Sequence, residues 1–178
     1  MLIQEKILCA KEKKPYLADV KTKINKNTSA KPYSASGNQL ASVSETMLQY
    51  QSMYSNDITL FTNSKKGLSA KAALDFIAVS GFSYQEFQET FNTTVKTIQN
   101  YALQNMKLDA ALSEKLLKSF SLFNKGIELF GSPKAFHNWL NTSAYGLGNE
   151  IPYNLMDTIT GISLIEEELI RIELGDLA

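Results

Sequence analysis

Apolar residues recur at helical spacing through most of the chain from Gly67 onward. Over residues 109–130 they alternate in steps of four and three, which gives one continuous apolar stripe along a long helix. The same spacing predicts shorter helices near residues 70–80, 83–91, 94–102, 132–140 and 160–174. No segment alternates apolar and polar residues with the period of two that a strand needs. The pattern therefore predicts an all-α fold.

Residues typical of helix ends occur at the boundaries of these segments. Ser83 followed by Glu86 is a capping box. The Ser83 side chain accepts a hydrogen bond from the backbone N–H of Glu86, and the Glu86 side chain accepts one from the backbone N–H of Ser83. Asn92 tolerates the left-handed conformation that a tight turn needs. Gly131 ends the long helix, and Ser132-Pro133 starts the next one with a cap and a proline at the first helical position.

The first 56 residues are rich in Ser, Asn, Thr and Gln and show little apolar periodicity. They predict a flexible, weakly basic arm with short helical pieces near residues 3–10 and 45–53. The remaining chain divides into residues 57–108, which hold the short helices, and residues 109–178, which begin with the long helix.

Charge and composition exclude several classes of protein. The 178 residues carry 18 basic and 18 acidic side chains, so no global positive field attracts nucleic acid, although the front of the chain is basic and the rear acidic. Cys9 is the only cysteine, which excludes an intrachain disulfide and a cysteine-rich zinc site. No signal peptide and no membrane-spanning run is visible. We therefore expect a cytoplasmic protein without membrane contact.

The only histidine and the only tryptophan lie together in LFGSPKAFHNWLN. His137 has no acid within a helical turn and no serine in a glycine-rich elbow to activate, so we interpret it as structural. Trp139 is either a core residue or an anchor for a partner, and its helical spacing favours the core. We expect no catalytic residue, no metal and no cofactor, and the protein is not expected to be an enzyme.

The triplet Glu166-Glu167-Glu168 is interpreted as the solvated face of the last helix. Neighbouring residues on a helix point in different directions, which makes these carboxylates unsuited to paired acid–base chemistry.

Two short helices joined at residues 92–94 fit a helix-turn-helix geometry. Asparagine can pair with adenine, while lysine and threonine can hold phosphates. An α-hairpin with a polar face explains the same pattern. In the first interpretation the candidate DNA-binding residues are Thr94, Lys96, Thr97, Gln99 and Asn100.

Three segments, LFGSPKAFHNWL, YGLGNEIPYNLMDTITG and IEEELIRIELG, resemble the toxin-binding domain of the Xre/MbcA/ParS antitoxin family. The matched elements, in order, are Phe130-Gly131, Ala135, Trp139-Leu140, Leu147-Gly148, Pro152 with Leu155, Gly161 and Gly175. Upstream, the segment from Gly67 to Tyr101 is similar to the Xre-type helix-turn-helix. Thr97-Ile98 resembles a Thr-Leu pair of that motif. Family members often carry arginines just after the pair, where this chain has Gln99, Asn100 and Tyr101.

The resemblance implies a helix-turn-helix bundle followed by a small helical toxin-binding domain. It further implies an antitoxin of a type II pair, whose partner is a RES-domain toxin that degrades NAD and is encoded by a neighbouring gene. The antitoxin would repress its own operator DNA as a homodimer. The residues expected to face the toxin are Leu147, Gly148, Asn149, Arg171, Glu173, Gly175 and Asp176. The alternative is a stand-alone DNA-binding regulator, or an orphan interaction module without a toxin.

Overall fold

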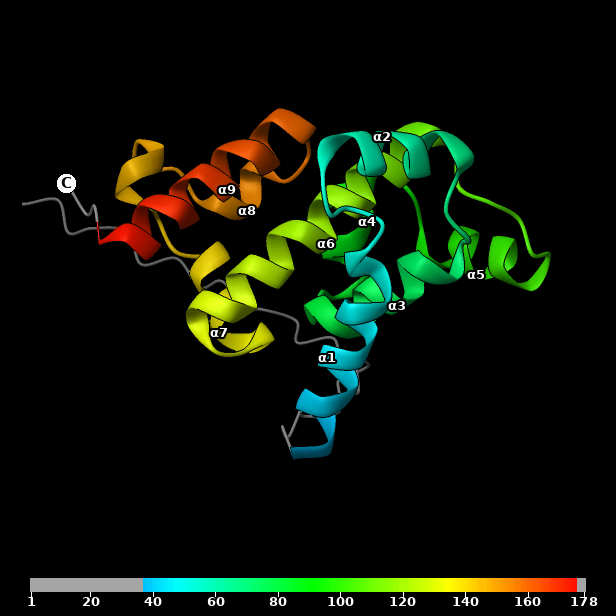
Figure 1. The fold of residues 1–178 in the computed structure, drawn as a ribbon, viewed down its shortest axis with the longest axis horizontal. Coiled ribbons are helices and arrows are strands. Elements are labelled where there is room, and N and C mark those ends of the chain that lie inside the picture. The colour runs from blue at the N-terminus through cyan, green and yellow to red at the C-terminus, as the bar shows by residue number, and fades with distance from the viewer. Residues whose placement is uncertain (1–36, 176–178) are drawn as a thin grey trace, which may run out of the picture. The chain divides into compact units, whose positions relative to one another are not determined.

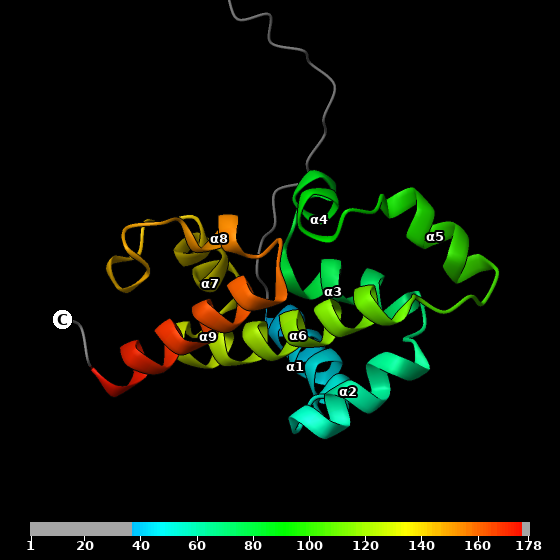
Figure 2. The ribbon, with the colours of Figure 1, turned by 90° about the horizontal axis from the view of Figure 1, so that it is seen from above.

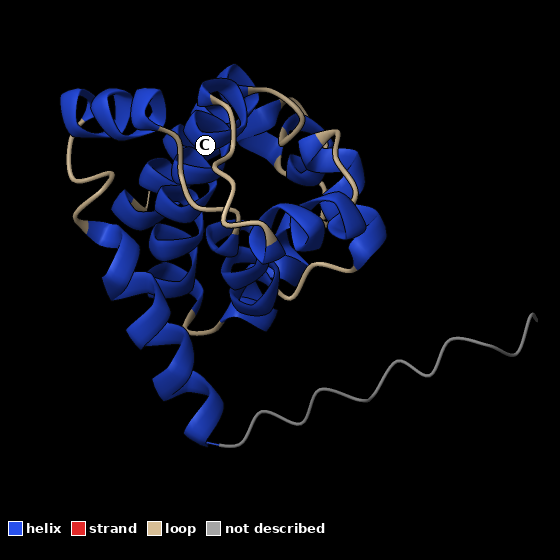
Figure 3. Ribbon diagram, turned by 90° about the vertical axis from the view of Figure 1, so that its right-hand side faces the viewer, coloured by secondary structure: helices blue, strands red, loops and turns tan. Residues whose placement is uncertain are grey.

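The computed structural model describes residues 37–175, with side chains from Ser42 onward, and within this range every regular element is a helix (Figures 1 and 3). The elements are α1 (Gly37–Gln51), α2 (Asp57–Lys66), α3 (Lys71–Ser80), α4 (Tyr84–Phe91), α5 (Val95–Leu103), α6 (Ala110–Phe130), α7 (Pro133–Leu140), the 3-10 turn η1 (Tyr145–Leu147), α8 (Pro152–Leu155) and α9 (Ile159–Leu174). The predicted all-α class is confirmed.

Helix α6 is the central element of the described residues, and α1, α2, α3, α7 and α9 all pack against it (Figure 2). Asp109 begins it by accepting a hydrogen bond from the backbone N–H of Leu112 at 2.9 Å. Its predicted apolar stripe supplies the fully buried Leu116, Phe120 and Phe123. The expected boundary between residues 57–108 and 109–178 falls at the start of α6. Because α6 contacts helices from both sides of that boundary, one hydrophobic core spans it.

Phe76 of α3 lies at the centre of this core. Its ring makes edge-on contacts with four other phenylalanine rings, with centroid distances of 5.1 to 5.8 Å. The four partners come from the α3–α4 turn, from α4 and from α6: Phe82, Phe91, Phe120 and Phe123. Edge-on geometry lets the positive edge of one ring meet the negative face of the next, which adds to the area that each ring buries.

Part of the predicted flexible arm is a helix that belongs to the core. Val43, Met47 and Tyr50 of α1 are buried, and the ring of Tyr50 stacks on Phe120 with a centroid distance of 4.5 Å. The hydroxyl of Tyr50 donates to Asp75 at 2.7 Å. The steps of four and three between these apolar residues are helical, but the surrounding Ser and Gln residues hide them. Residues 1–36, including the predicted helical piece near 3–10, lie outside the described residues.

The short helices α4 and α5 have the ends that the sequence predicts. Ser83 and Glu86 form the complete capping box, and Asn92 ends α4 in the left-handed conformation with φ of 52°. Thr94 begins α5 by accepting from the backbone N–H of Thr97 at 3.1 Å. The inner face of α5 is formed by Val95 and Ile98, which are buried. These caps fix the angle at which α5 leaves α4, and they leave its polar face exposed.

Candidate functional site

An open groove with a volume of about 740 Å³ lies between α7, the loop that carries η1, and the last turns of α9. Its walls include Trp139 from α7, Tyr145 and Asn149 from the loop, and Arg171 and Ile172 from α9. The side of the groove thus combines aromatic, amide and guanidinium groups. A surface of this kind suits a macromolecular partner, because large aromatic side chains and arginine contribute most of the binding free energy at protein interfaces.

The loop that forms one wall of the groove is closed by its own backbone. The N–H groups of Ala144 and Asn149 donate to the carbonyls of Glu150 and Ala144, each at 3.0 Å, and the hydroxyl of Ser143 donates to the carbonyl of Asn149 at 2.9 Å. Gly148 and Asn149 both adopt the left-handed conformation, with φ of 70° and 66°. Glycine and asparagine are the residues that tolerate this backbone, which explains the sequence Gly-Asn at the tip of the loop.

A buried ion pair holds this loop against α9. Glu168 is 5% exposed, and its carboxylate accepts from Arg171 Nε at 2.8 Å and lies 2.7 Å from Arg171 Nη2. The same guanidinium donates from Nη2 to the carbonyl of Gly146 at 3.3 Å. A Cβ atom at Gly146 would lie 2.0 Å from the carboxylate, so only glycine lets the loop approach this closely. The interpretation of all three glutamates as a solvated face is therefore wrong for Glu168.

Trp139 has two roles at once. Its indole stacks on Phe130 and Phe136, with centroid distances of 5.3 and 5.8 Å, and it is only partly buried. The rest of its ring system lines the groove. The two alternatives left open by the sequence, core packing and a partner anchor, are therefore not exclusive in this fold.

The structure brings some of the predicted toxin-facing residues together. Gly148, Asn149 and Arg171 line the groove, with 41% of the Arg171 side chain exposed. Leu147 is half-buried and packs against the core. The sequence analysis did not select Tyr145, although it is 74% exposed on the same wall, because an isolated tyrosine in a loop carries no signal of its environment.

The remaining predicted toxin-facing residues lie at the end of α9. Glu173 forms an ion pair with Lys125 of α6 at 2.8 Å. Gly175 ends the helix in the left-handed conformation, with φ of 75°. Asp176 lies outside the described residues. No side chain of this group lines the groove within the part of the chain that the structure describes.

The candidate DNA-binding residues occupy one surface of α5 and its cap. Lys96, Gln99 and Asn100 are exposed and lie at helical spacing on one face. The hydroxyls of Thr94 and Thr97 lie 2.9 Å apart and are hydrogen-bonded to each other. The polar face predicted from the sequence is therefore open to solvent. Thr94 and Thr97 use their hydroxyls in hydrogen bonds at the N-terminal end of α5.

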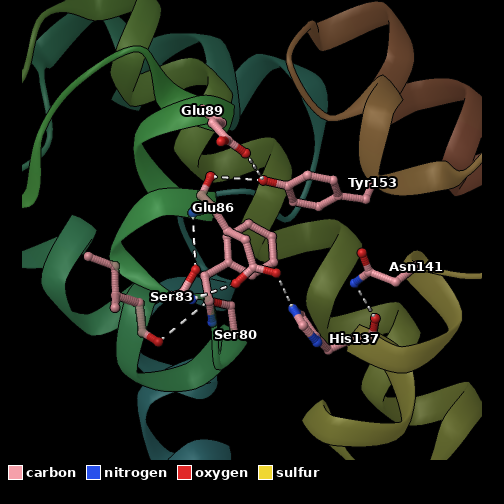
Figure 4. Close-up of polar contacts among 9 residues, drawn as sticks. Ser80, Ser83, Glu86, Glu89, His137, Asn141 and Tyr153 are labelled. Atoms are coloured by element: carbon pink, nitrogen blue, oxygen red, sulfur yellow. Dashed lines mark hydrogen bonds and ion pairs between the residues drawn. The ribbon is translucent and has the colours of Figure 1, made fainter. Parts of the chain in front are cut away.

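A polar junction, which we define as Glu86, Glu89, His137 and Tyr153, joins α4 to α7 and α8 (Figure 4). His137 Nε2 lies 2.9 Å from Glu86 Oε1. The hydroxyl of Tyr153 lies 3.3 Å from the carbonyl of Glu86 and 3.2 Å from Glu89 Oε2. The acid that the sequence lacked near His137 thus comes from 51 residues away. This acid, Glu86, caps the start of α4 and also contacts His137 of α7.

Glu86 is the carboxyl group in this junction whose pKa is lowered in the fold. Burial raises its pKa, but hydrogen bonds from the Ser83 N–H and hydroxyl, together with His137, hold the pKa below the ordinary value. A carboxyl group with a lowered folded pKa stabilises the fold above its unfolded pKa. This contribution is lost as the pH falls through the folded pKa.

We expect Glu86→Gln to lower the free energy of unfolding near neutral pH by roughly 1 kcal/mol, because the cap and the contact with His137 lose their charge. The difference from the wild type should close as the pH falls below the ordinary carboxyl pKa of 4.5. Urea denaturation of both proteins, from neutral pH to below the ordinary carboxyl pKa, measures the difference in the free energy of unfolding and its dependence on pH. Glu128→Gln, which alters an exposed carboxylate of α6, is the control. A difference that persists in acid would contradict the assignment.

The groove, its aromatic wall and its ion-paired loop define a helical binding domain. Residues 125–175 match the family described as the antitoxin Xre/MbcA/ParS C-terminal toxin-binding domain. This range contains α7, η1, α8 and α9 entire, together with the end of α6. Every residue that lines the groove falls within it.

A protein from Sphingobium sp. (strain YBL2), named Prs ADP-ribosylating antitoxin, is similar to this chain. The two are 25% identical over 123 residues, which is 64% of this chain and 77% of the relative. Both matches support an antitoxin of the Xre/MbcA/ParS type, and they confirm the resemblance found in the sequence motifs. The matched toxin-binding domain implies a toxin partner, and the two matches suggest a regulatory role. No helix within residues 37–175 has the length and apolar character needed to cross a bilayer.

Proposed function

We propose that this antitoxin neutralises a RES-domain toxin, encoded by a neighbouring gene, through the groove between α7, the η1 loop and α9. The observation that carries the proposal is that the residues lining the groove all fall within the segment similar to a toxin-binding domain. Tyr145, Trp139 and the Arg171 guanidinium give the groove the aromatic and arginine side chains that dominate protein interfaces.

The chemistry of the relative supports an NAD-consuming toxin. The name of the Sphingobium protein links it to ADP-ribosylation, and NAD is the ordinary donor of an ADP-ribosyl group. Exposed carboxylates lie on α9 and on the loop before α8, at Glu150, Glu167 and Glu173, the last of which is ion-paired with Lys125. Exposed carboxylates favour association with a basic cleft built for an anionic dinucleotide, because complementary charge raises the association rate and helps to select the partner.

We further propose that α5 reads operator DNA and that the chain represses its own operon as a homodimer in the cytoplasm. In this arrangement α4 and α5 form the helix-turn-helix, and Lys96, Gln99 and Asn100 face the major groove. A two-fold dimer matches paired half-sites. The alternative is a stand-alone regulator that has kept the fold without a toxin.

Co-expression with the neighbouring gene tests the proposal. We expect that gene alone to stop growth and deplete cellular NAD, and we expect this chain to restore both. Asn100→Ala, which alters the exposed face of α5, is the matched control and should still restore growth, because α5 is not part of the groove. Toxicity without NAD loss would exclude a toxin that degrades NAD and would favour one that transfers ADP-ribose to a target protein, while an absence of toxicity would favour the stand-alone regulator.

A further inference from the structure

Three lysines without an acidic partner gather where α2 ends and where α5 leads into α6. We call Lys65, Lys66 and Lys107 the lysine cluster. All three side chains are exposed, and none has a carboxylate within 4.0 Å among the described residues. Elsewhere in the described chain, Lys71, Lys118, Lys125 and Arg171 are ion-paired, while Lys96, Lys115 and Lys134 are single lysines that also lack a carboxylate within 4.0 Å. No carboxylate of the described residues therefore offsets the charge of the cluster within this distance.

Backbone and side-chain contacts fix the members of the cluster beside one another. Lys107 Nζ donates to the carbonyl of Lys66 at 3.0 Å, and Lys107 pairs with Ser69 in an isolated antiparallel bridge. Leu108 donates its N–H to the carbonyl of Leu68 at 2.8 Å. The end of α2 and the α5–α6 connection thus run side by side. An ammonium group has three donors, so Lys107 keeps hydrogen-bonding capacity for a partner.

The position of the cluster relative to α5 suits the border of a DNA groove. Lys107 follows the last residue of α5, Leu103, by four positions. The nine residues of α5 span roughly 13 Å at 1.5 Å per residue, and the N-terminal residues of a recognition helix contact the base edges in the major groove. When α5 lies in that groove, the cluster lies beyond its C-terminal end, where the phosphates line the edge.

Helix stability explains part of the positive charge at this end of the molecule, but it does not explain Lys96. Cations at the end of a helix favour its dipole, which accounts for Lys65 and Lys66 at the end of α2. Lys96 lies in the first turn of α5, where a cation opposes the dipole, so helix stability does not account for it. The sequence also has no acidic residue between Glu89 and Asp109. This end of the molecule is therefore kept free of negative charge over a continuous stretch.

We propose that the lysine cluster contacts the phosphate backbone of DNA and supplies affinity that the weakly charged α5 lacks. The inference rests on the proposed function, because it requires α5 to meet DNA. The lysines give affinity that does not depend on base sequence, while Gln99 and Asn100 supply the base contacts. This division explains how a recognition helix with one lysine, and without the arginines typical of the family, can hold an operator.

The salt dependence of DNA binding tests the proposal. The probes are a duplex from the region upstream of this chain's own gene and an unrelated duplex of equal length, titrated by fluorescence anisotropy over a salt series. Each lost phosphate contact reduces the slope of log K against log salt by about 0.9. We expect the triple variant Lys65→Gln/Lys66→Gln/Lys107→Gln to reduce the slope by up to about 2.7. The affinity for both duplexes should fall in parallel.

Two further triple variants control for net charge and for folding. Lys118→Gln/Lys125→Gln/Lys134→Gln removes the same charge from α6 and α7 and should leave the slope unchanged. Lys65→Arg/Lys66→Arg/Lys107→Arg keeps the charge and should retain the wild-type slope. If both glutamine variants reduce the slope equally, the effect is one of net charge and the proposal is wrong.

A base-reading variant separates failure of this inference from failure of the proposed DNA binding. Asn100→Ala should reduce the preference for the upstream duplex without changing the salt slope. If it does so while the cluster variant keeps the wild-type slope, DNA binding stands and the inference is wrong. If the wild type binds neither duplex, both are wrong. A cluster variant that loses only its binding to phosphatidylserine vesicles would assign the lysines to a membrane surface, against the proposal.

Discussion

Phe76→Ala is expected to lower the free energy of unfolding by about 4 kcal/mol, near the middle of the range for a buried phenylalanine. It should also abolish toxin neutralisation at growth temperature, although Phe76 lies in α3 and not in the groove. The ring is fully buried and contacts four others, so its removal leaves a cavity that rigid neighbours cannot fill. A loss of this size is a large fraction of the stability of an ordinary domain.

Urea denaturation of the wild type and of Phe76→Ala measures the effect with two probes. Circular dichroism follows all helices, while the fluorescence of Trp139, the only tryptophan, follows the end of the molecule that holds the groove. Because one core spans α3, α6 and α9, both probes should report a single transition that shifts together. Phe61→Ala is the matched control, since Phe61 is 56% exposed, and it should change stability by less than about 0.5 kcal/mol. Two separate transitions would contradict the single core.

Arg171→Ala is expected to have the second largest effect, because it leaves the Glu168 carboxylate buried without its partner. Breaking a fully buried pair costs roughly 3–5 kcal/mol, and the partial exposure of Arg171 brings our expectation to about 2 kcal/mol. The same change frees the carbonyl of Gly146 from α9. We therefore expect weaker toxin binding as well as lower stability, because the loop wall of the groove loses its attachment.

Thermal denaturation and titration with the toxin measure the two consequences of Arg171→Ala. Glu168→Gln/Arg171→Ala should recover part of the stability, since the buried group is then neutral, and the single variants complete a double-mutant cycle. Lys125→Ala is the control, because it removes the more exposed pair with Glu173 and should cost less than about 1 kcal/mol. If Arg171→Ala were as stable as the control, the buried carboxylate of Glu168 would not require the guanidinium to be tolerated in the fold.

Features that depend on a few neighbouring residues could be predicted from the sequence. The capping box at Ser83, the left-handed Asn92 and the stop at Gly131 all follow from local backbone chemistry, and the structure has each of them. The apolar stripe along α6 could also be predicted, because the helical spacing of its apolar residues continues without interruption over the whole helix. The helical piece near residues 45–53 was predicted, but the full length of α1 and its place in the core were missed, because a polar composition conceals its three buried apolar residues.

The interior of the candidate site depends on contacts between distant parts of the chain. Nothing in the triplet of glutamates indicates which one is buried, because burial of Glu168 requires Gly146 to approach from a separate loop. His137 and Glu86 meet only once α7 packs near α4. The resemblance of the Leu-Gly motif indicated the right loop, but the glycine that lets the loop reach the carboxylate is Gly146, one residue before the first residue selected.

Helix α6 also sets a distance between the two proposed binding surfaces. Its 21 residues span about 31 Å, with the α5–α6 connection at one end and Phe130, stacked on Trp139, at the other. The groove and α5 therefore lie near opposite ends of α6. Under the proposed function, one molecule would offer its toxin and its operator separate surfaces, so silencing of the gene pair and inhibition of the toxin would not require separate pools of the antitoxin.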